Sequence, residues 1–137
     1  MDIVSACLCG VNCKYSGGNN FNPKIYKEML SGKLLPVCPE LLGGLGIPRS
    51  PCEISEGKVI NKEGNDVTQN FIEGAEKTLE IAKTAGAKRA ILKQRSPSCG
   101  NGKIYDGTFC GRLIEGYGIT AKILKDNGIE VISEEEF

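Results

Sequence analysis

The alternation of short apolar strands with helices is the feature of this sequence that constrains its fold most. We expect strands over 2–8, 34–37, 90–92 and 131–132, and helices over 23–31, 69–85 and 120–127. The helix over 69–85 is the clearest, because its apolar residues recur on one face and Gly86 ends it. Strands that alternate with helices form a mainly parallel sheet with right-handed crossovers. A chain of 137 residues is too short for two independent cores, so we expect a single α/β domain over residues 1–137.

The segments between these elements are rich in glycine, proline and asparagine. We expect loops over 9–22, 39–51 and 93–102 and an antiparallel excursion over 53–68. The helix over 120–127 has Thr120 as a possible cap. The acidic segment Glu134 to Glu136 is expected to be a solvated tail.

Cysteine and histidine content narrows the available chemistry. The chain has seven cysteines and no histidine. The missing histidine excludes the usual general base, the Ser-His and Cys-His pairs, and every metal site that contains histidine. Seven cysteines cannot all pair, and a reducing cytoplasm disfavours disulfides. A metal held by soft ligands must therefore lie on thiolates.

Charge and hydropathy indicate where such a protein works. The formal net charge is zero, which argues against a strong general attraction to nucleic acid or to an anionic membrane. No apolar run approaches the length needed to span a bilayer. The first residues, MDIVSACLCG, lack the features of a signal peptide. We expect a cytoplasmic protein with no membrane partner.

Three cysteines occupy equivalent places in the predicted topology. Cys7 lies at the end of the first strand, Cys38 at the end of the second, and Cys99 in the loop after the third. Because ligands bind beyond the carboxyl ends of parallel strands, we expect these thiols at one edge of the sheet. Three thiolates suit a [4Fe–4S] cluster with one iron left open to a substrate. No CxxC pair is present to indicate a zinc ribbon or a thioredoxin-like motif.

The other cysteines are of two kinds. Cys52 and Cys110 are interpreted as ordinary small apolar residues. Cys9 and Cys13 are close enough to Cys7 in sequence to approach a shared site. Cys9 is the main rival for a fourth ligand, because alternate residues at a strand end can share a face. A fourth thiolate would make the protein an electron carrier or a sensor.

Three motifs and the last segment of the chain resemble the bacterial thiouracil desulfidases. They are SACLCGVNCKYSGG, LLPVCPELLGGLGIPRSPCEI, LKQRSPSCGNGKIYDGTF and GITAKILKDNGIEVISEEEF. The resemblance covers nearly the whole chain, and the combination is specific. It implies a compact Rossmann-like domain with a [4Fe–4S] cluster on Cys7, Cys38 and Cys99. It also implies removal of sulfur from a thiolated pyrimidine such as 2-thiouracil, which gives uracil and sulfide without net redox change.

The same resemblance implies roles for two further residues, Glu40 as the catalytic acid or base and Ser96 as a hydroxyl that assists the substrate. Glu40 is two residues from Cys38, and a helix-dipole role is equally compatible with the sequence. Loop or cap duty is the commoner role of a serine such as Ser96. Arg49 could orient an acidic imide or a phosphate, but an exposed surface arginine is the commoner case. Lys93 could line the same edge.

The sequence leaves several functions open. The expected partner is a small thiolated nucleobase. Thiolated tRNA is an alternative substrate, which the zero net charge does not support. A cluster-dependent lyase or a sulfur-transfer protein is a second enzyme class, and an iron–sulfur sensor or structural metal protein is the non-enzyme alternative. The oligomeric state cannot be inferred from the sequence.

Overall fold

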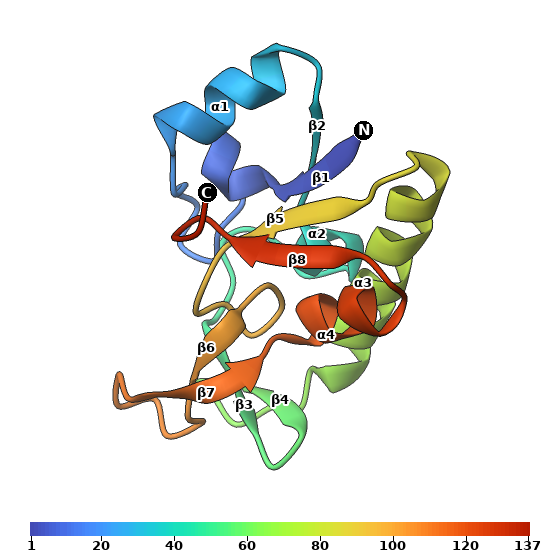
Figure 1. Cartoon of the computed structure of the whole chain (residues 1–137). Helices are drawn as coiled ribbons and strands as arrows, with labels where there is room; N and C mark the ends of the chain where they lie inside the picture. Colours follow the sequence, from blue (N-terminus) through green and yellow to red (C-terminus); the bar gives the residue numbers. More distant parts are fainter.

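Four short parallel strands form the central sheet in a computed structural model that describes residues 1–137 (Figure 1). In spatial order the strands are β2 (Leu34–Val37), β1 (Asp2–Ser5), β5 (Arg89–Leu92) and β8 (Glu130–Ser133). All neighbouring pairs are parallel. This confirms the predicted α/β fold with a mainly parallel sheet.

The register of the sheet brings the ends of its strands to one level. Ser5, the last residue of β1, pairs with Val37, the last residue of β2. Leu92, the last residue of β5, pairs with Ser133, the last residue of β8. The segments that follow these strands therefore start side by side at the carboxyl edge of the sheet.

Helices cover both faces of the sheet. α1 (Pro23–Leu30) lies on one face, and α3 (Thr68–Thr84) and α4 (Ile119–Asp126) lie on the other (Figure 1). Side chains alternate across each strand, so Ile3 and Leu92 join the core on the α3 and α4 side. Val4 and Ile91 join a second core with Ile25 of α1. The sheet is thus buried on both faces, as is usual for a parallel sheet.

The first strand is shorter than predicted, and the last helix begins one residue earlier than predicted. β1 stops at Ser5, and residues Ala6–Cys9 form a short 3-10 helix (η1) that ends at Gly10 with φ 88°. α4 begins at Ile119 after Gly118, so Thr120 lies inside the helix and does not cap it. The Thr120 hydroxyl is instead buried against another hydroxyl, that of Ser98, at 2.7 Å.

A four-residue helix, α2 (Pro39–Leu42), occupies part of the segment predicted to be a loop. Proline suits its first position, and Glu40 lies in its first turn. α2 touches α3 through backbone atoms, because a Cβ at Gly74 would overlap the carbonyl oxygen of Pro39. A Cβ at Gly43 would likewise overlap the carbonyl oxygen of Asn70. These two glycines allow α2 to lie directly on α3.

Two antiparallel hairpins complete the fold, below the sheet in the view of Figure 1. β3 (Cys52–Ser55) and β4 (Lys58–Asn61) form the predicted excursion. β6 (Asn101–Tyr105) and β7 (Leu113–Tyr117) form a second hairpin that was not predicted. Most β7 residues are exposed, and neither strand of this hairpin shows the regular alternation of buried and exposed residues that indicates a half-buried strand.

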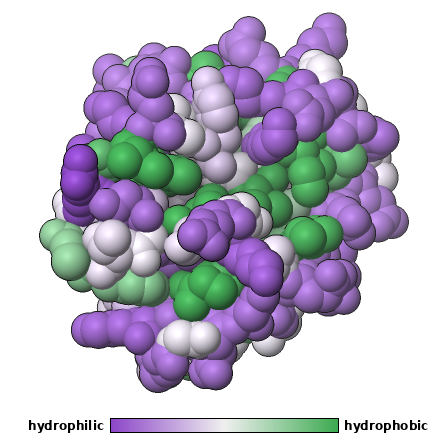
Figure 2. Space-filling model, turned by 90° about the horizontal axis from the view of Figure 1, so that it is seen from below, coloured by the Kyte–Doolittle hydropathy of each residue, from purple (hydrophilic) through white to green (hydrophobic).

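The outer surface carries both apolar and hydrophilic side chains. Seen from below, the molecule shows apolar patches across the middle of the face, with hydrophilic residues around them (Figure 2). None of its helices has both the length and the apolar character that crossing a bilayer requires.

The contact between α2 and α3 predicts an unusual sign for a helical Gly→Ala substitution. Alanine normally stabilises a helix interior by about 1 kcal/mol relative to glycine. We expect Gly74→Ala to lower the free energy of unfolding by about 1–3 kcal/mol instead, because the new methyl group pushes α2 away. Urea unfolding measures this difference. Gly46→Ala, in the loop after α2, is the control for the added methyl group alone, since nothing lies within 4 Å of its Cβ position. A stabilised Gly74→Ala variant would contradict the packing.

Candidate active site

A cavity of about 500 Å³ opens at the carboxyl edge of β1, β2 and β5. Five residues predicted from sequence lie on its wall: Cys7, Cys38, Glu40, Ser96 and Cys99. Cys7 comes from η1 after β1, and Cys38 lies between β2 and α2. Cys99 and Ser96 come from the loop after β5. The common end level of the strands explains why segments so distant in sequence meet here.

The three cysteine side chains differ in their environment. Burial is the main cause that raises the pKa of Cys99, to about 12, and a hydrogen bond from Ser5 opposes it. Burial also raises the pKa of Cys7, against a hydrogen bond from Asn20. The pKa of Cys38 is lowered to about 6, because the thiol of Cys13 and the backbone N–H of Leu41 donate hydrogen bonds to it. Charge on any one of these sulfurs is felt by the other two, so the three thiols form one electrostatic group.

The donor set fits an iron–sulfur cluster. Three thiols from three separate segments face one cavity, and each has a hydrogen-bond donor for its thiolate. Thiolates that receive such bonds are the usual ligands of [4Fe–4S] clusters. No three His, Cys, Asp or Glu side chains are grouped closely enough to hold a single metal ion. In a [4Fe–4S] cluster each thiolate binds a different iron, so three thiols that are too far apart to share one metal ion can still hold a cluster.

The structure distinguishes Cys9 from Cys13, both of which the sequence left as neighbours of a shared site. Cys9 is buried beside Leu8 in the core on the α1 side and does not line the cavity. Cys13 does line it, and the hydrogen bond that its thiol donates to Cys38 raises its pKa. Cys52 also lines the cavity, and burial raises its pKa to about 11. Cys13, and not Cys9, is therefore the nearby cysteine that could serve as a fourth thiol at the site.

Glu40 and Arg49 form an ion pair on the cavity wall. The Arg49 Nη2 to Glu40 Oε2 distance is 2.5 Å. The Arg49 side chain is only 7% exposed, so the expectation of an exposed surface arginine is wrong. Nη2 also donates to the carbonyl oxygen of Cys13, at 2.9 Å. The other carboxylate oxygen of Glu40, Oε1, has no hydrogen-bond partner in the protein and is free to act on a ligand.

Ser96 has the loop and cap role that is common for serine. Its hydroxyl can still donate one hydrogen bond to a ligand. Its Oγ accepts hydrogen bonds from the backbone N–H groups of Ser98 and Cys99, at 3.1 and 3.0 Å. With both acceptor positions used, the hydroxyl hydrogen remains to be donated. Ser98 is not available in the same way, since its hydroxyl is paired with Thr120.

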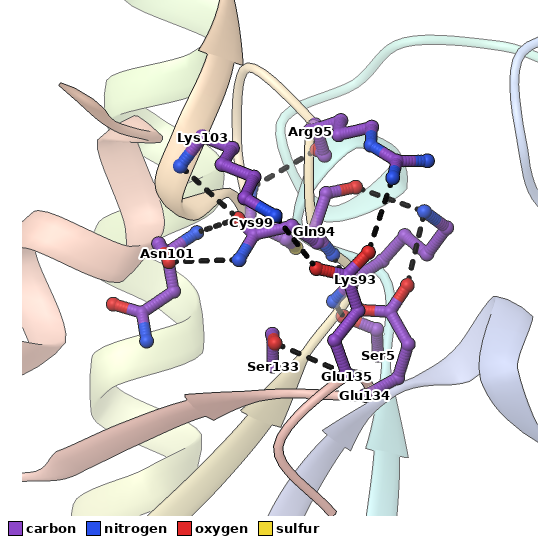
Figure 3. A network of polar contacts seen from close by, with 11 residues as sticks. Ser5, Lys93, Gln94, Arg95, Cys99, Asn101, Lys103, Ser133, Glu134 and Glu135 are labelled. Carbon is purple, nitrogen blue, oxygen red and sulfur yellow. Dashed lines mark hydrogen bonds and ion pairs between the residues drawn. The ribbon is translucent and has the colours of Figure 1, made fainter. Parts of the chain in front are cut away.

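The loop that carries Ser96 and Cys99 is closed by Gln94 (Figure 3). Its side-chain Oε1 accepts from the backbone N–H of Asn101 at 2.7 Å, and its Nε2 donates to the carbonyl oxygen of Asn101 at 2.8 Å. Gln94 is 5% exposed, so these bonds are protected from water. Both ends of the loop are thereby held at a fixed separation.

The acidic segment after β8 is part of this network and is not a solvated tail (Figure 3). Glu134 accepts from the backbone N–H of Gln94 at 2.7 Å and pairs with Lys93 at 3.0 Å. Glu135 pairs with Arg95 at 3.1 Å. The signal for this was present in the sequence, because Glu134 follows a parallel strand and so belongs to the same edge as the three cysteines.

Basic and aromatic residues complete the cavity wall. The basic members are Lys14, Arg49, Lys62, Lys93 and Arg95, and the aromatic ones are Tyr15, Tyr105 and Phe109. The charge of Lys93 favours a thiolate at Cys7. Cations of this kind offset the negative charge of grouped thiolates. The aromatic rings offer apolar faces to a planar ligand.

Comparison with known proteins gives three matches. The sequence matches the 2-thiouracil desulfurase family over residues 3–136. It is 47% identical over 146 residues to the uncharacterized protein YbbK of Bacillus subtilis (strain 168), with 99% of this chain and 97% of that protein covered. The fold is similar to a solved structure of the [4Fe-4S]-dependent thiouracil desulfidase TudS, with a TM-score of 0.95 and 40% identity. That match covers 99% of this chain and 91% of the other.

The contrast between Cys38 and Cys99 predicts their reactivity in cluster-free protein. At pH 7 the pKa of about 6 leaves Cys38 mostly as thiolate, and the pKa of about 12 leaves Cys99 as thiol. We expect iodoacetamide to alkylate Cys38 much faster than Cys99, with a rate that falls below pH 6, because the thiolate is the nucleophile. Peptide mass spectrometry measures both rates, with the exposed Cys110 as internal reference. Equal rates at Cys38 and Cys99 would contradict the described site.

Proposed function

The chain belongs to the 2-thiouracil desulfurase family, and we propose that it removes sulfur from a thiolated pyrimidine with a [4Fe–4S] cluster bound to Cys7, Cys38 and Cys99. One observation carries this proposal: three thiols from three strand ends share a cavity with a carboxylate that has a free oxygen. The similar solved protein is by its name a [4Fe-4S]-dependent thiouracil desulfidase. When bound, the cluster supplies an iron without a protein ligand, which is a Lewis acid for a soft thiocarbonyl sulfur.

Glu40 moves the proton in this proposal. Desulfuration replaces sulfur by the oxygen of one water, and the products are uracil and sulfide, with no electrons gained or lost. Oε1 of Glu40 accepts a proton from the water that attacks the carbon, and Oε2 stays paired with Arg49. The chain contains no histidine, and Glu40 is the carboxylate on this wall that lies two residues from a proposed cluster ligand.

Ser96 and the aromatic residues orient the substrate. The hydroxyl hydrogen of Ser96 is donated to a heteroatom on the edge of the pyrimidine, since its oxygen is already occupied by two backbone N–H groups. Tyr105 and Phe109 offer apolar faces for the planar ring. Both kinds of contact are typical of small-molecule sites, which combine an apolar lining with a few placed polar groups.

The proposed substrate is a free thiolated nucleobase, and the proposed compartment is the cytoplasm. The cavity volume of about 500 Å³ lies in the ordinary range of small-molecule sites. The zero net charge does not favour tRNA as the partner. All seven cysteines are free thiols, which suits a reducing compartment.

The proposed ligand set predicts which cysteines the cluster needs. After anaerobic reconstitution, we expect a brown wild-type protein that contains iron and acid-labile sulfide. Alanine at Cys7, Cys38 or Cys99 should abolish or strongly reduce the iron content, because thiolates hold the cluster. Serine at Cys9, Cys13, Cys52 or Cys110 should leave the cluster in place. Stoichiometric zinc without sulfide in the wild type would exclude the cluster.

The proposed role of Glu40 predicts a loss of turnover without loss of the cluster. We expect Glu40→Gln to keep the iron and sulfide content and to lower kcat by roughly 10²–10⁴-fold, the usual contribution of a general acid or base. Glu76→Gln, a change of an exposed glutamate on α3 outside the cavity wall, is the control. A decrease of only twofold at Glu40, measured from uracil formation, would assign the proton transfer to another group.

A further inference from the structure

We propose that Arg49 is a positioning residue that fixes the catalytic orientation of Glu40, an inference that rests on the proposed function. The two side chains are joined through Nη2 and Oε2 at 2.5 Å, and they are 7% and 18% exposed. Charge-assisted hydrogen bonds shielded from water are the strong kind, because solvent does not compete for them. Glu40 has no other hydrogen-bonded partner for its carboxylate, so its orientation depends on this one contact.

Arg49 is itself fixed by backbone atoms on two sides. Its Nη2 donates to the carbonyl oxygen of Cys13 at 2.9 Å, and its Nη1 donates to that of Gly46 at 3.2 Å. Its backbone N–H donates to the carbonyl oxygen of Tyr15 at 2.9 Å. The guanidinium is therefore anchored independently of Glu40, and the carboxylate takes its position from the arginine.

The pair selects one carboxylate oxygen for the reaction. A glutamate side chain loses much rotamer freedom when it is held in one orientation, and a strong partner must compensate for this loss. Arg49 occupies Oε2 and leaves Oε1 without a partner, on a residue that lines the cavity. Without the guanidinium, the carboxylate would exchange its two oxygens and change rotamer, so that fewer encounters with water would be productive.

Two other cations on the wall, Lys93 and Arg95, are paired with other carboxylates and do not replace Arg49. Lys93 is committed to Glu134 at 3.0 Å and to the carbonyl oxygen of Gln94 at 2.9 Å. Arg95 is paired with Glu135. Only Arg49 contacts Glu40, and its planar guanidinium can reach Glu40 and two carbonyl groups at the same time, which a lysine ammonium cannot do in the same geometry.

A double-mutant cycle between Arg49 and Glu40 tests this inference. The proteins are wild type, R49Q, R49K, E40Q and R49Q/E40Q, each reconstituted anaerobically and assayed with 2-thiouracil for uracil formation. We expect R49Q to lower kcat by about 100-fold, as misplacement of a catalytic group does, with KM nearly unchanged. R49K should keep an intermediate kcat. In the E40Q background, R49Q should have no further effect, because Arg49 acts through Glu40.

Two measurements separate positioning from a general role in the fold. Iron content and the midpoint of thermal unfolding are recorded for every variant. R112Q, which removes an exposed arginine paired with Asp106, is the control. An equal loss of kcat on adding R49Q to wild type and to E40Q would overturn the inference, as would a wild-type kcat in R49Q. If R49Q does not retain its cluster, the same cycle is run with R49K. An equal loss of kcat on adding R49K to wild type and to E40Q would then overturn the inference.

The failure of this inference differs from a failure of the proposed function. A wild-type protein that contains its full cluster and forms no uracil would contradict the proposed function. A wild-type protein that forms uracil, together with additive losses in the cycle, would contradict only the role of Arg49.

Discussion

The parallel pairing of β1 with its neighbours β2 and β5 is the constraint on which the rest of the structure depends. Because Ser5 lies opposite Val37, the chain leaves β1 and β2 at the same level, and Cys7 and Cys38 follow within two residues. β5 brings the loop with Cys99 to the same edge. Each strand is only four residues long, so the pairing has to be supported by the helices on both faces. A shift of the register by one residue would exchange the buried faces and separate the thiols.

Contacts outside the sheet then fix the segments that carry the site. The backbone contact of α2 with α3, at Gly43 and Gly74, sets the height of Glu40 beside Cys38. Gln94 and Glu134 hold the loop with Cys99. The site is thus built from two short helices, η1 and α2, and from loops, and each of these segments is tied to a larger element. This arrangement suits a reaction that needs several groups in one small volume.

Much of this arrangement could be predicted from local sequence patterns. Alternating strands and helices predict the parallel sheet, and that topology places Cys7, Cys38 and Cys99 at one edge without any knowledge of their contacts. The burial of Arg49 could not be predicted in this way, because it depends on a path between 43 and 49 that local propensity does not determine. Cys9 and Cys13 both follow Cys7 closely in sequence, and only the turn after η1 decides that Cys13, the more distant of the two, reaches the cavity. The place of Glu134 does follow from the topology, because it comes directly after β8 as the cysteines come after β1, β2 and β5.

The most direct test of the account is the stoichiometry of desulfuration by the reconstituted protein. The protein is incubated anaerobically with 2-thiouracil in the absence of any electron donor, and uracil and sulfide are both quantified against cluster-free protein. The account predicts equal amounts of uracil and sulfide over many turnovers, only with the cluster present. A protein with a full cluster that forms no uracil, or that requires an added reductant for turnover, would contradict it.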